Sequence, residues 1–402
     1  MEPFNGKRPA RVSPLIIRVL EQINSERRPS RSKGNALAVA ELSRLFTKQR
    51  AALGGRYLDD RDLAVAYLSY FMPVNLSKIQ VLLDELPEDS LKVNEGIRFS
   101  VLDLGSGPGT GGLAVLDWLH RCHNGGASNL SVAAVDSSGA ALRDAERLWG
   151  AYNRTAGISG ARLRTYEANL EHALKGSLGE EIRRTGPYDL IILANSLNEM
   201  WRESSDPTAD RAGLVTAALS LLSPHGTVMI LEPALRETSR ALHQVRDRLL
   251  QDKRCTIYSP CLHEGNCPAL VNQDDWCHEE RGWEAPAVIQ QIDQEVGFIK
   301  DALKFSYLLL RTDGRTIAPR SPNTFRIVSE LRKLKGDTRA WLCNELGRSE
   351  VGRLVRAKSA ANSGWEECER GTIVRIESIT RQERASLGRI PDDATVQIIR
   401  SV

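Results

Sequence analysis

Apolar and polar positions alternate regularly over the middle of the chain, from residue 97 to residue 311. Apolar runs of strand length recur there, and stretches with apolar residues three and four positions apart follow them. The strand-like runs are 97–102, 130–135, 161–166, 188–194 and 227–231, with 303–311 as the expected closing strand. Helical spacing is found at 112–119, 140–149 and 210–222. This order predicts an α/β fold with a mostly parallel, doubly wound sheet.

The two ends of the chain have different patterns. Residues 1–95 are expected to be helical, because their apolar residues fall on single stripes at 14–23, 36–46, 63–72 and 76–86. Residues 312–402 carry short alternating runs that are typical of strands, at 340–343, 351–355, 372–376 and 395–399. We therefore expect an N-terminal helical region at 1–95, an α/β domain at 96–311 and a small, basic, β-rich C-terminal region at 312–402.

Composition adds little to this picture. The chain has 402 residues, of which 41% are apolar, and a net charge of +3. This is enough apolar content for ordinary cores, but the charge says little about partners. No apolar run approaches the roughly 18 residues of a membrane span, and the first residues lack the apolar centre of a signal peptide. We expect a soluble, intracellular protein with no membrane partner.

The strongest chemical signal is the glycine-rich stretch Asp103-Leu-Gly-Ser-Gly-Pro-Gly109, between a predicted strand and a predicted helix. Its glycines allow a sharp turn and leave no Cβ between the backbone and a bound nucleoside. The overlapping pattern from Gly107 to Gly112 also fits the pyrophosphate loop of dinucleotide enzymes, but that pattern alone is a weak signal. The acid before the first glycine gives D-x-G-x-G-x-G, the first motif of S-adenosylmethionine-dependent methyltransferases. The stretch therefore favours a class I, Rossmann-like methyltransferase domain.

Further contacts with the cofactor are expected where strands end. Asp136 follows the strand at 130–135, where a carboxylate can accept hydrogen bonds from both ribose hydroxyls, and Asp103 is expected near the methionine end. Glu167 and Asn169 follow the next strand and are candidates for contact with the adenine. The full set of predicted cofactor-binding residues is Asp103, Gly105, Ser106, Gly107, Gly109, Asp136, Glu167 and Asn169.

The strand at 188–194 ends on Asn195-Ser-Leu-Asn-Glu199, at the edge where ligands bind in open α/β sheets. Asn195, Asn198 and Glu199 are therefore the candidates to border a methyl acceptor. The stretch lacks the Asn/Asp-Pro-Pro-aromatic pattern that positions an exocyclic amine, and no cysteine lies near it to attack a pyrimidine ring. The sequence therefore identifies no general base.

A second chemical signal is a group of cysteines in the segment 252–285, which we interpret as an insertion into the α/β domain. Cys255, Cys261, Cys267 and Cys277 are four of the seven cysteines and lie within 23 residues. Because intracellular thiols stay reduced, this grouping favours metal ligation over disulfides, with the metal stabilising about residues 253–285. The spacing lacks the C-x2–4-C knuckle of most zinc sites and favours a 4Fe-4S cluster, with zinc and unligated thiols as alternatives. Cys343 is isolated, and we expect it to be a buried structural thiol.

The C-terminal region begins with a basic segment. Between residues 311 and 358 there are twelve Lys and Arg against five Asp and Glu. Such an excess is expected of a surface that contacts RNA phosphates, although a solvated charged face is the alternative. The residues that we predict to bind RNA are Arg326, Arg332, Lys333, Lys335 and Arg339.

Several of these stretches resemble one family. The glycine loop, Ala66-Tyr-Leu-Ser-Tyr-Phe-Met-Pro73, and above all Ser259-Pro-Cys-Leu-His-Glu-Gly-Asn-Cys-Pro268 with Asp275-Trp-Cys-His278 are similar to the methyltransferase-like assembly proteins of the mitochondrial small ribosomal subunit and their bacterial relatives. The segments 325–328 and 332–336 look similar to that family's basic C-terminal segment. The resemblance covers most of 60–345. Leu262 and Glu279 depart from the family's pattern, but neither change removes a ligand.

The resemblance implies a role in ribosome assembly or translation, with the small ribosomal subunit and its rRNA as partners. It also implies S-adenosylmethionine as cofactor, a 4Fe-4S cluster on the four grouped cysteines, and a location in the bacterial cytoplasm or, in a eukaryote, the mitochondrial matrix. Three functions remain open: an active rRNA methyltransferase, a catalytically silent assembly or binding factor that keeps the cofactor pocket, and a small-molecule methyltransferase. The basic segment argues against the last.

Overall fold

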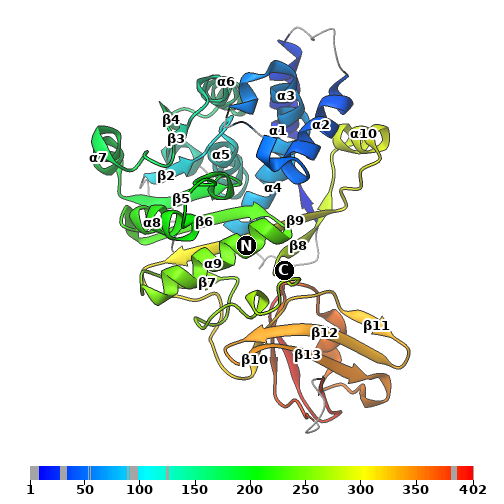
Figure 1. Cartoon of the computed structure of the whole chain (residues 1–402). Coiled ribbons are helices and arrows are strands. Elements are labelled where there is room, and N and C mark those ends of the chain that lie inside the picture. Colours follow the sequence, from blue (N-terminus) through cyan, green and yellow to red (C-terminus); the bar gives the residue numbers. More distant parts are fainter. Residues whose placement is uncertain are drawn as a thin grey trace.

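The computed structural model describes residues 9–27, 34–52, 54, 56–87, 90, 98–123, 126–381 and 387–401. The expected boundary between residues 95 and 96 lies outside these ranges. The described residues form a large central sheet with helices on both faces, and a second sheet from the C-terminal part of the chain lies below it in Figure 1. The prediction of an α/β fold with a central sheet is confirmed.

The central sheet contains nine strands among the described residues. Five are parallel and follow the spatial order β4 (Arg162–Glu167), β3 (Leu130–Asp136), β2 (Phe99–Leu104), β5 (Tyr188–Ala194) and β6 (Leu222–Pro233). Beyond β6 lies the antiparallel strand β9 (Ala302–Arg311). It pairs with β7 (Thr256–Ser259) and β8 (Glu279–Glu284), and β1 (Ala10–Arg11) pairs with β8 at the edge.

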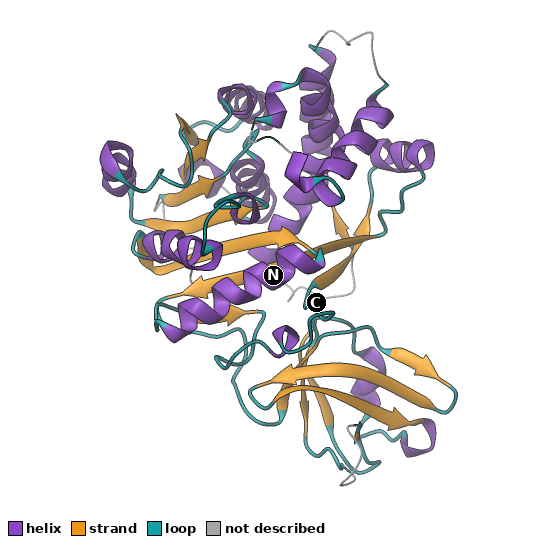
Figure 2. Cartoon of the chain, in the orientation of Figure 1, coloured by secondary structure: helices purple, strands orange, loops and turns teal. Residues whose placement is uncertain are grey.

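Helices cover both faces of this sheet because successive strand residues point to opposite sides. Val101 belongs to the core on one face and its neighbour Leu102 to the core on the other. The first face is covered by α5 (Thr110–Cys122), α6 (Gly139–Ala156) and the N-terminal helices. The second is covered by α7 (Gly176–Thr185), α8 (Pro207–Leu219) and α9 (Arg236–Gln251), as Figure 2 shows.

The N-terminal region is helical, as its apolar stripes predict. It contains α1 (Pro14–Ser25), α2 (Asn35–Thr47), α3 (Arg61–Ala66) and α4 (Met72–Leu83), and α10 (Ala287–Val296) packs against α2. The helices expected at 63–72 and 76–86 are one continuous run instead. Pro73 has no N–H to donate to the preceding turn, and the wider π-helical turn Tyr67–Phe71 lets the helix continue past it. No described helix is both long and apolar enough to span a membrane.

Two expectations about the segment before β9 are wrong. The strand at 303–311 does not close the sheet, because β7 and β8 both pair with it on the side away from β6. The same two strands come from 252–285, so this segment is not one irregular insertion. Its irregular part runs from residue 260 to residue 278, and the strands on either side are held by the hydrogen bonds of the sheet.

The second sheet contains β10 (Thr324–Ile327), β11 (Arg332–Leu334), β12 (Asp337–Asn344), β13 (Gly347–Leu354), β14 (Ile373–Ile376), β15 (Gly388–Arg389) and β16 (Val396–Arg400). All four of the alternating runs expected in this region lie largely within strands. The sheet has its own apolar core, centred on the fully buried Trp365.

Buried ion pairs join the two sheets. Arg326 on β10 pairs with Glu279 on β8 and donates to the hydroxyl of Tyr307 on β9 at 2.9 Å. Arg281 pairs with the same glutamate at 2.6 Å and with Glu85 at 3.0 Å. Burial alone would raise the pKa of Glu279, but the two arginines lower it to about 2. The carboxylate is therefore ionised, and the joint between the sheets is a network of buried ion pairs, in which Nη1 of Arg326 has no hydrogen-bond partner.

Candidate functional site

The glycine loop turns from β2 into α5 in a shape that other residues could not adopt. Gly105 has φ of 80°, and a Cβ on it would lie 2.4 Å from the Cβ of Ser196. Gly109 has φ of 79°, and a Cβ there would lie 2.9 Å from the Cβ of Ala145 on α6. Both positions combine a left-handed backbone with direct packing, so these two glycines are required for the loop to lie against β5 and α6.

Asp103 lies beneath the loop. It is 1% exposed, and the backbone N–H of Gly112 donates to its Oδ2 at 3.0 Å, so the carboxylate stabilises the first turn of α5. Burial raises its pKa to about 7. Neither Asp103, which was predicted near the methionine end of the cofactor, nor Ser106, which was predicted to bind the cofactor, lines the cavity described next.

Asp136 ends β3 at the mouth of the loop. Its Oδ2 accepts from the N–H of Gly107 at 2.8 Å, and its Oδ1 accepts from the N–H of Ser138 at 2.9 Å. Each carboxylate oxygen has a second lone pair that a hydroxyl can use. Asp136 therefore fixes the glycine loop and keeps acceptor capacity toward the cavity.

A cavity of about 1530 Å³ opens at the carboxyl ends of the parallel strands, between them and the N-terminal helices. It brings together most of the sequence-predicted cofactor and acceptor residues: Gly105, Gly107, Asp136, Glu167, Asn169, Asn195, Asn198 and Glu199. Gly109 does not line it and instead supports the loop from behind. This is the position at which ligands bind in open α/β sheets.

Behind the acceptor side of the cavity lies a buried glutamate that the sequence did not single out and that does not itself line the cavity. Glu232, near the end of β6, accepts from the backbone N–H of Asn198 at 3.0 Å and also from its side-chain amide. The carboxamide oxygen of Asn198 accepts from Arg50, which follows α2. Burial raises the pKa of Glu232 to about 8. The only sign of Glu232 in the sequence was its position at the end of a predicted strand. A Glu-Pro pair at such a position is also common where a strand simply ends, so it did not indicate a site.

Glu199 faces the same cavity. Burial raises its pKa to about 7, against the opposing effect of Arg202 and Arg50. Asn195 precedes it in the left-handed region with φ of 59°, a conformation that a non-glycine residue adopts rarely and that turns the chain sharply out of β5. A carboxyl group that titrates near neutrality in a cleft can exchange a proton or meet a cationic ligand.

The wall opposite the sheet is made by the N-terminal helices. Phe46, Tyr57, Tyr67 and Phe71 line the cavity, and the rings of Phe46 and Tyr57 meet edge to face with centroids 5.4 Å apart. Phe46, Tyr67 and Phe71 lie in stretches with predicted helical spacing, whereas Tyr57 lies outside them. The spacing could not identify the pocket, because a face that lines a pocket has the same apolar spacing as a face that is packed. The structure adds this wall to the site that the motifs predicted.

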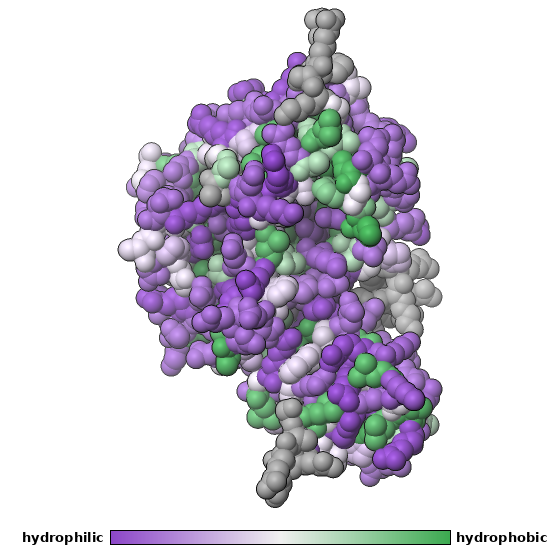
Figure 3. Space-filling view, turned by 45° about the vertical axis from the view of Figure 1, so that its right-hand side comes forward, coloured by the Kyte–Doolittle hydropathy of each residue, from purple (hydrophilic) through white to green (hydrophobic). Residues whose placement is uncertain are grey.

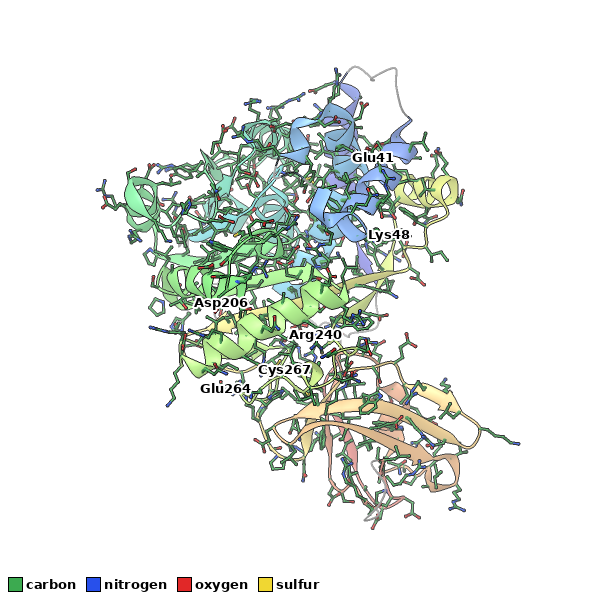
Figure 4. All side chains as sticks on the ribbon, viewed as in Figure 1. Glu41, Lys48, Asp206, Arg240, Glu264 and Cys267 are labelled. Atoms are coloured by element: carbon green, nitrogen blue, oxygen red, sulfur yellow. The ribbon has the colours of Figure 1, made fainter. Side chains whose placement is uncertain are left out.

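A second, small cavity of about 50 Å³ lies between α9 and the second sheet, close to Cys267 in Figure 4. Three predicted ligands line it: Cys261, Cys267 and Cys277. The fourth cysteine on its wall is Cys343, from β12, and its Sγ lies 3.7 Å from Nε2 of His263. Cys255 does not line this cavity and packs in the apolar core below α9. The structure therefore groups Cys343, and not Cys255, with the other three cysteines, and Cys343 is not isolated in space.

Helix α9 holds the cysteine loop in place. Arg240 donates to the carbonyl oxygens of Ala269, Asn272 and Asp275 at 2.7–2.9 Å. The fully buried Arg246 donates to Sγ of Cys261 at 3.3 Å, and Asp247 accepts from the N–H of Cys267 at 2.9 Å. The loop therefore has a protein scaffold of its own, contrary to the expectation that it depends on metal alone.

The chemistry of this donor set suits a metal, but its spacing is wide. Among the described residues, no three His, Cys, Asp or Glu side chains are grouped closely enough to hold a single metal ion. Burial, followed by the charge of Cys261, raises the pKa of Cys277 to about 11, and burial raises that of Cys343 well above the usual value. Without a metal these thiols stay protonated at neutral pH.

The basic segment is divided between the core and the surface. Arg326 is 4% exposed and ion-paired with Glu279, so its guanidinium is committed to the joint between the sheets and the prediction that it binds RNA is wrong. Arg332 pairs with Glu350, and Arg339 pairs with Asp337 at 2.6 Å. Lys333 on β11 and Lys335 at the turn between β11 and β12 are exposed.

The chain is similar to one family model and to several solved structures. No curated protein matches the sequence. Among solved structures, an O-methyltransferase family protein from Burkholderia thailandensis is 15% identical with a TM-score of 0.33, over 75% of this chain and 72% of that one. An rRNA methylase from Streptococcus thermophilus is 12% identical with a TM-score of 0.28, over 58% and 96%. The family model described as mitochondrial small ribosomal subunit Rsm22 matches residues 61–371, and the chain therefore belongs to the Rsm22 family.

Proposed function

We propose that this protein binds S-adenosylmethionine in the large cavity and acts on or with the small ribosomal subunit, in ribosome assembly or translation. The observation that carries the cofactor assignment is Asp136, which anchors Gly107 and faces a cavity lined by the ends of β2, β3 and β5. In this account Asp136 accepts from the ribose hydroxyls, while Glu167 and Asn169 border the adenine.

The strand arrangement supports a methyltransferase over a dinucleotide enzyme. A dinucleotide-binding sheet continues with a sixth parallel strand after the first five. Here the strand beside β6 is β9, which is antiparallel, with Phe305 opposite Pro233. The sheet described here therefore lacks the sixth parallel strand expected of a dinucleotide-binding domain, which argues against a pyrophosphate site at the glycine loop.

Within this function, a catalytically silent factor is the second candidate, and one observation favours it. The side-chain amide of Asn198 is already engaged, because its oxygen accepts from Arg50 and its nitrogen donates to Glu232 and to the carbonyl of Asn195. A side chain with these partners has little capacity left to orient an acceptor base. Glu199 is then the remaining candidate for proton transfer.

We further propose that Cys261, Cys267, Cys277 and Cys343 hold a 4Fe-4S cluster. In a zinc site all four sulfur atoms lie about 2.3 Å from one ion, whereas in a cubane each thiolate binds its own iron. The cysteines lack the C-x2–4-C spacing of most zinc sites, which favours the cluster over zinc as the alternative. When bound, the cluster would link the cysteine loop to β12. Arg246, beside Cys261, would offset part of the negative charge of the thiolates.

RNA contact is proposed for the turn between β11 and β12. Lys333 and Lys335 project there without burial, and Arg332 and Arg339 lie next to them with acidic partners. The face of the molecule in Figure 3 is dominated by hydrophilic side chains, with apolar ones in small separate groups. Such a surface suits phosphate contacts better than burial against an apolar partner. The compartment follows from the partner: bacterial cytoplasm, or the mitochondrial matrix in a eukaryote.

One experiment tests association and catalysis together. The protein is mixed with immature small subunits and S-adenosylmethionine labelled in its methyl group, and the subunits are then sedimented. Cosedimentation with label in the rRNA supports an active rRNA methyltransferase. Cosedimentation without transfer supports the silent factor, and absence of cosedimentation under all cofactor conditions would exclude the small subunit as partner.

A further inference from the structure

Three lysines line the large cavity on the side away from the expected nucleoside. Lys78 comes from α4, Lys300 from the segment after α10, and Lys304 from β9. Phe305, next to Lys304, pairs with Pro233 at the carboxyl end of β6. Asp136 and Glu167 instead end β3 and β4. At about 4.8 Å per strand, β3 and β9 are roughly 19 Å apart along the sheet edge. Asp136 and Glu167 therefore lie at the end of the cavity opposite the three lysines. Three arginines also line the cavity: Arg56 pairs with Glu167, and the charges of Arg50 and Arg202 act on Glu199.

Lys78 is the unusual member of this group. It is 7% exposed, and its Nζ donates to Oδ1 of Asn75 at 3.2 Å, which is a neutral partner. The charged group that acts on it is Lys300, another cation. A buried ammonium ordinarily has an anionic partner, because removing its charge from water is costly. Burial lowers the pKa of Lys78 to about 7, as expected of a cation without one.

The other two lysines are less buried and complete the basic end. Nζ of Lys300 lies 5.9 Å from the centre of the Tyr70 ring, whose hydroxyl donates to Asp293. Lys304 is exposed and also pairs with Glu280 at 3.6 Å, so only part of its charge is available. The acidic side chains that line the cavity are on the β3, β4 and β5 side: Asp136, Glu167, Glu171 and Glu199.

From this arrangement we infer that Lys78 and Lys300, with Lys304 at the rim, form a binding subsite for a phosphate group of the acceptor. The inference rests on the proposed function, since it assumes that the nucleoside of the cofactor lies at Asp136. The cavity has room for a second ligand beside a cofactor. Ammonium groups bind phosphate as point charges, and two of them can share its oxygens. A phosphate in this position would lie on the β6 and β9 side of the cavity, away from Asp136 and Glu167.

The phosphate could belong to a polynucleotide or to a small phosphorylated compound, and binding measurements separate the two. Calorimetric titrations use the full chain saturated with S-adenosylhomocysteine, with inorganic phosphate, a 5′-mononucleotide and a ribotrinucleotide as probes. We expect Lys78→Met and Lys300→Gln each to weaken the binding of all three about tenfold. Lys175→Gln, at the exposed start of α7, should leave them unchanged. Tighter binding of the trinucleotide identifies a polynucleotide, and equal binding identifies a small phosphorylated compound.

Affinity for S-adenosylhomocysteine, measured in parallel, reports that each variant is folded. Phosphate binding that is absent, or that is unchanged in both variants, would overturn the subsite. A tenfold loss of S-adenosylhomocysteine affinity in Lys300→Gln, without any phosphate binding by the wild type, would assign the lysines to the cofactor's own carboxylate and equally overturn it. A wild type that binds phosphate through these lysines but does not bind S-adenosylhomocysteine would contradict the proposed function and still support the phosphate subsite.

Discussion

Asp136 has two roles at one carboxylate: it fixes the glycine loop, and we expect it to accept from the ribose. The D-x-G-x-G-x-G motif and the strand that ends at Asp136 were readable in the sequence, because both depend on local spacing. Its hydrogen bond to Gly107 was not, since it links residues 29 positions apart. A substitution therefore changes both the loop and the expected ribose contact.

Asp136→Asn should weaken S-adenosylmethionine binding about tenfold or more, since a hydrogen bond to a charged group contributes roughly 1.5–3 kcal/mol. The amide can still accept from one backbone N–H, but its NH2 group opposes the other. Competition binding against S-adenosylhomocysteine measures the loss, with the exposed Asp392→Asn as control. Equal affinities for the two variants would remove Asp136 from the site.

Glu199 should make cofactor binding depend on pH. Its pKa is raised to about 7, so below this pH the carboxyl is neutral and above it carries a negative charge. S-adenosylmethionine has a positive sulfonium and ammonium, so its affinity should rise between about pH 6 and about pH 8. Glu199→Gln should flatten that rise, and titrations across this range measure it. A profile that is the same in the variant assigns the pH dependence to another group, such as Asp103.

At the scale of elements, strands and helices with clear periodicity were predictable, and connections between distant segments were not. The parallel strands and the helices α5, α6 and α8 follow from hydrophobic spacing, whereas α7 was not predicted. The merging of 63–72 with the following helix depends on the π-helical turn before Pro73, which has no simple sequence signal. The pairing of β7 and β8 with β9 is decided by tertiary packing, because a short apolar run does not indicate which strand it will pair with.

The turn between β11 and β12 should carry salt-dependent RNA binding. Replacing Lys333 and Lys335 together by Gln should reduce the slope of log affinity against log salt by about two units if each contacts a phosphate. Adding Arg332→Gln should change the slope less, because Arg332 already pairs with Glu350. The exposed pair Lys175 and Lys253, replaced in the same way, is the matched control. A slope that falls equally in the control would reflect net charge alone.

At the scale of the whole molecule, the four thiols at the small cavity connect the two sheets. Three come from the loop between β7 and β8, and Cys343 comes from β12. Spacing along the sequence selected Cys255 because it is near the others in the chain. Cys343 lies 66 positions after Cys277 and could be found only after the second sheet was placed. The resemblance had no residue to carry over at that position.

Substitution of single cysteines should show whether the ligand set contains Cys343 or Cys255. Anaerobically purified wild type should contain about four irons and four acid-labile sulfides per chain. Cys343→Ser should lose most of both and increase hydrogen exchange over residues 260–278, while β2 and β5 stay protected because the sheet does not depend on the cluster. Cys255→Ala should keep the metal content. Loss of iron in Cys255→Ala but not in Cys343→Ser would restore the set expected from spacing, and stoichiometric zinc without sulfide would replace the cluster.

The central claim is that the cavity above Asp136 binds S-adenosylmethionine, and calorimetric titration of the full chain tests it most directly. The wild type should bind one equivalent per chain. Gly105→Ala should abolish or strongly weaken this binding, because its Cβ would lie 2.4 Å from that of Ser196, whereas Gly213→Ala on α8, with nothing within 4 Å of its Cβ, should bind like the wild type. No binding by the wild type, or equal binding by all three proteins, would contradict the account.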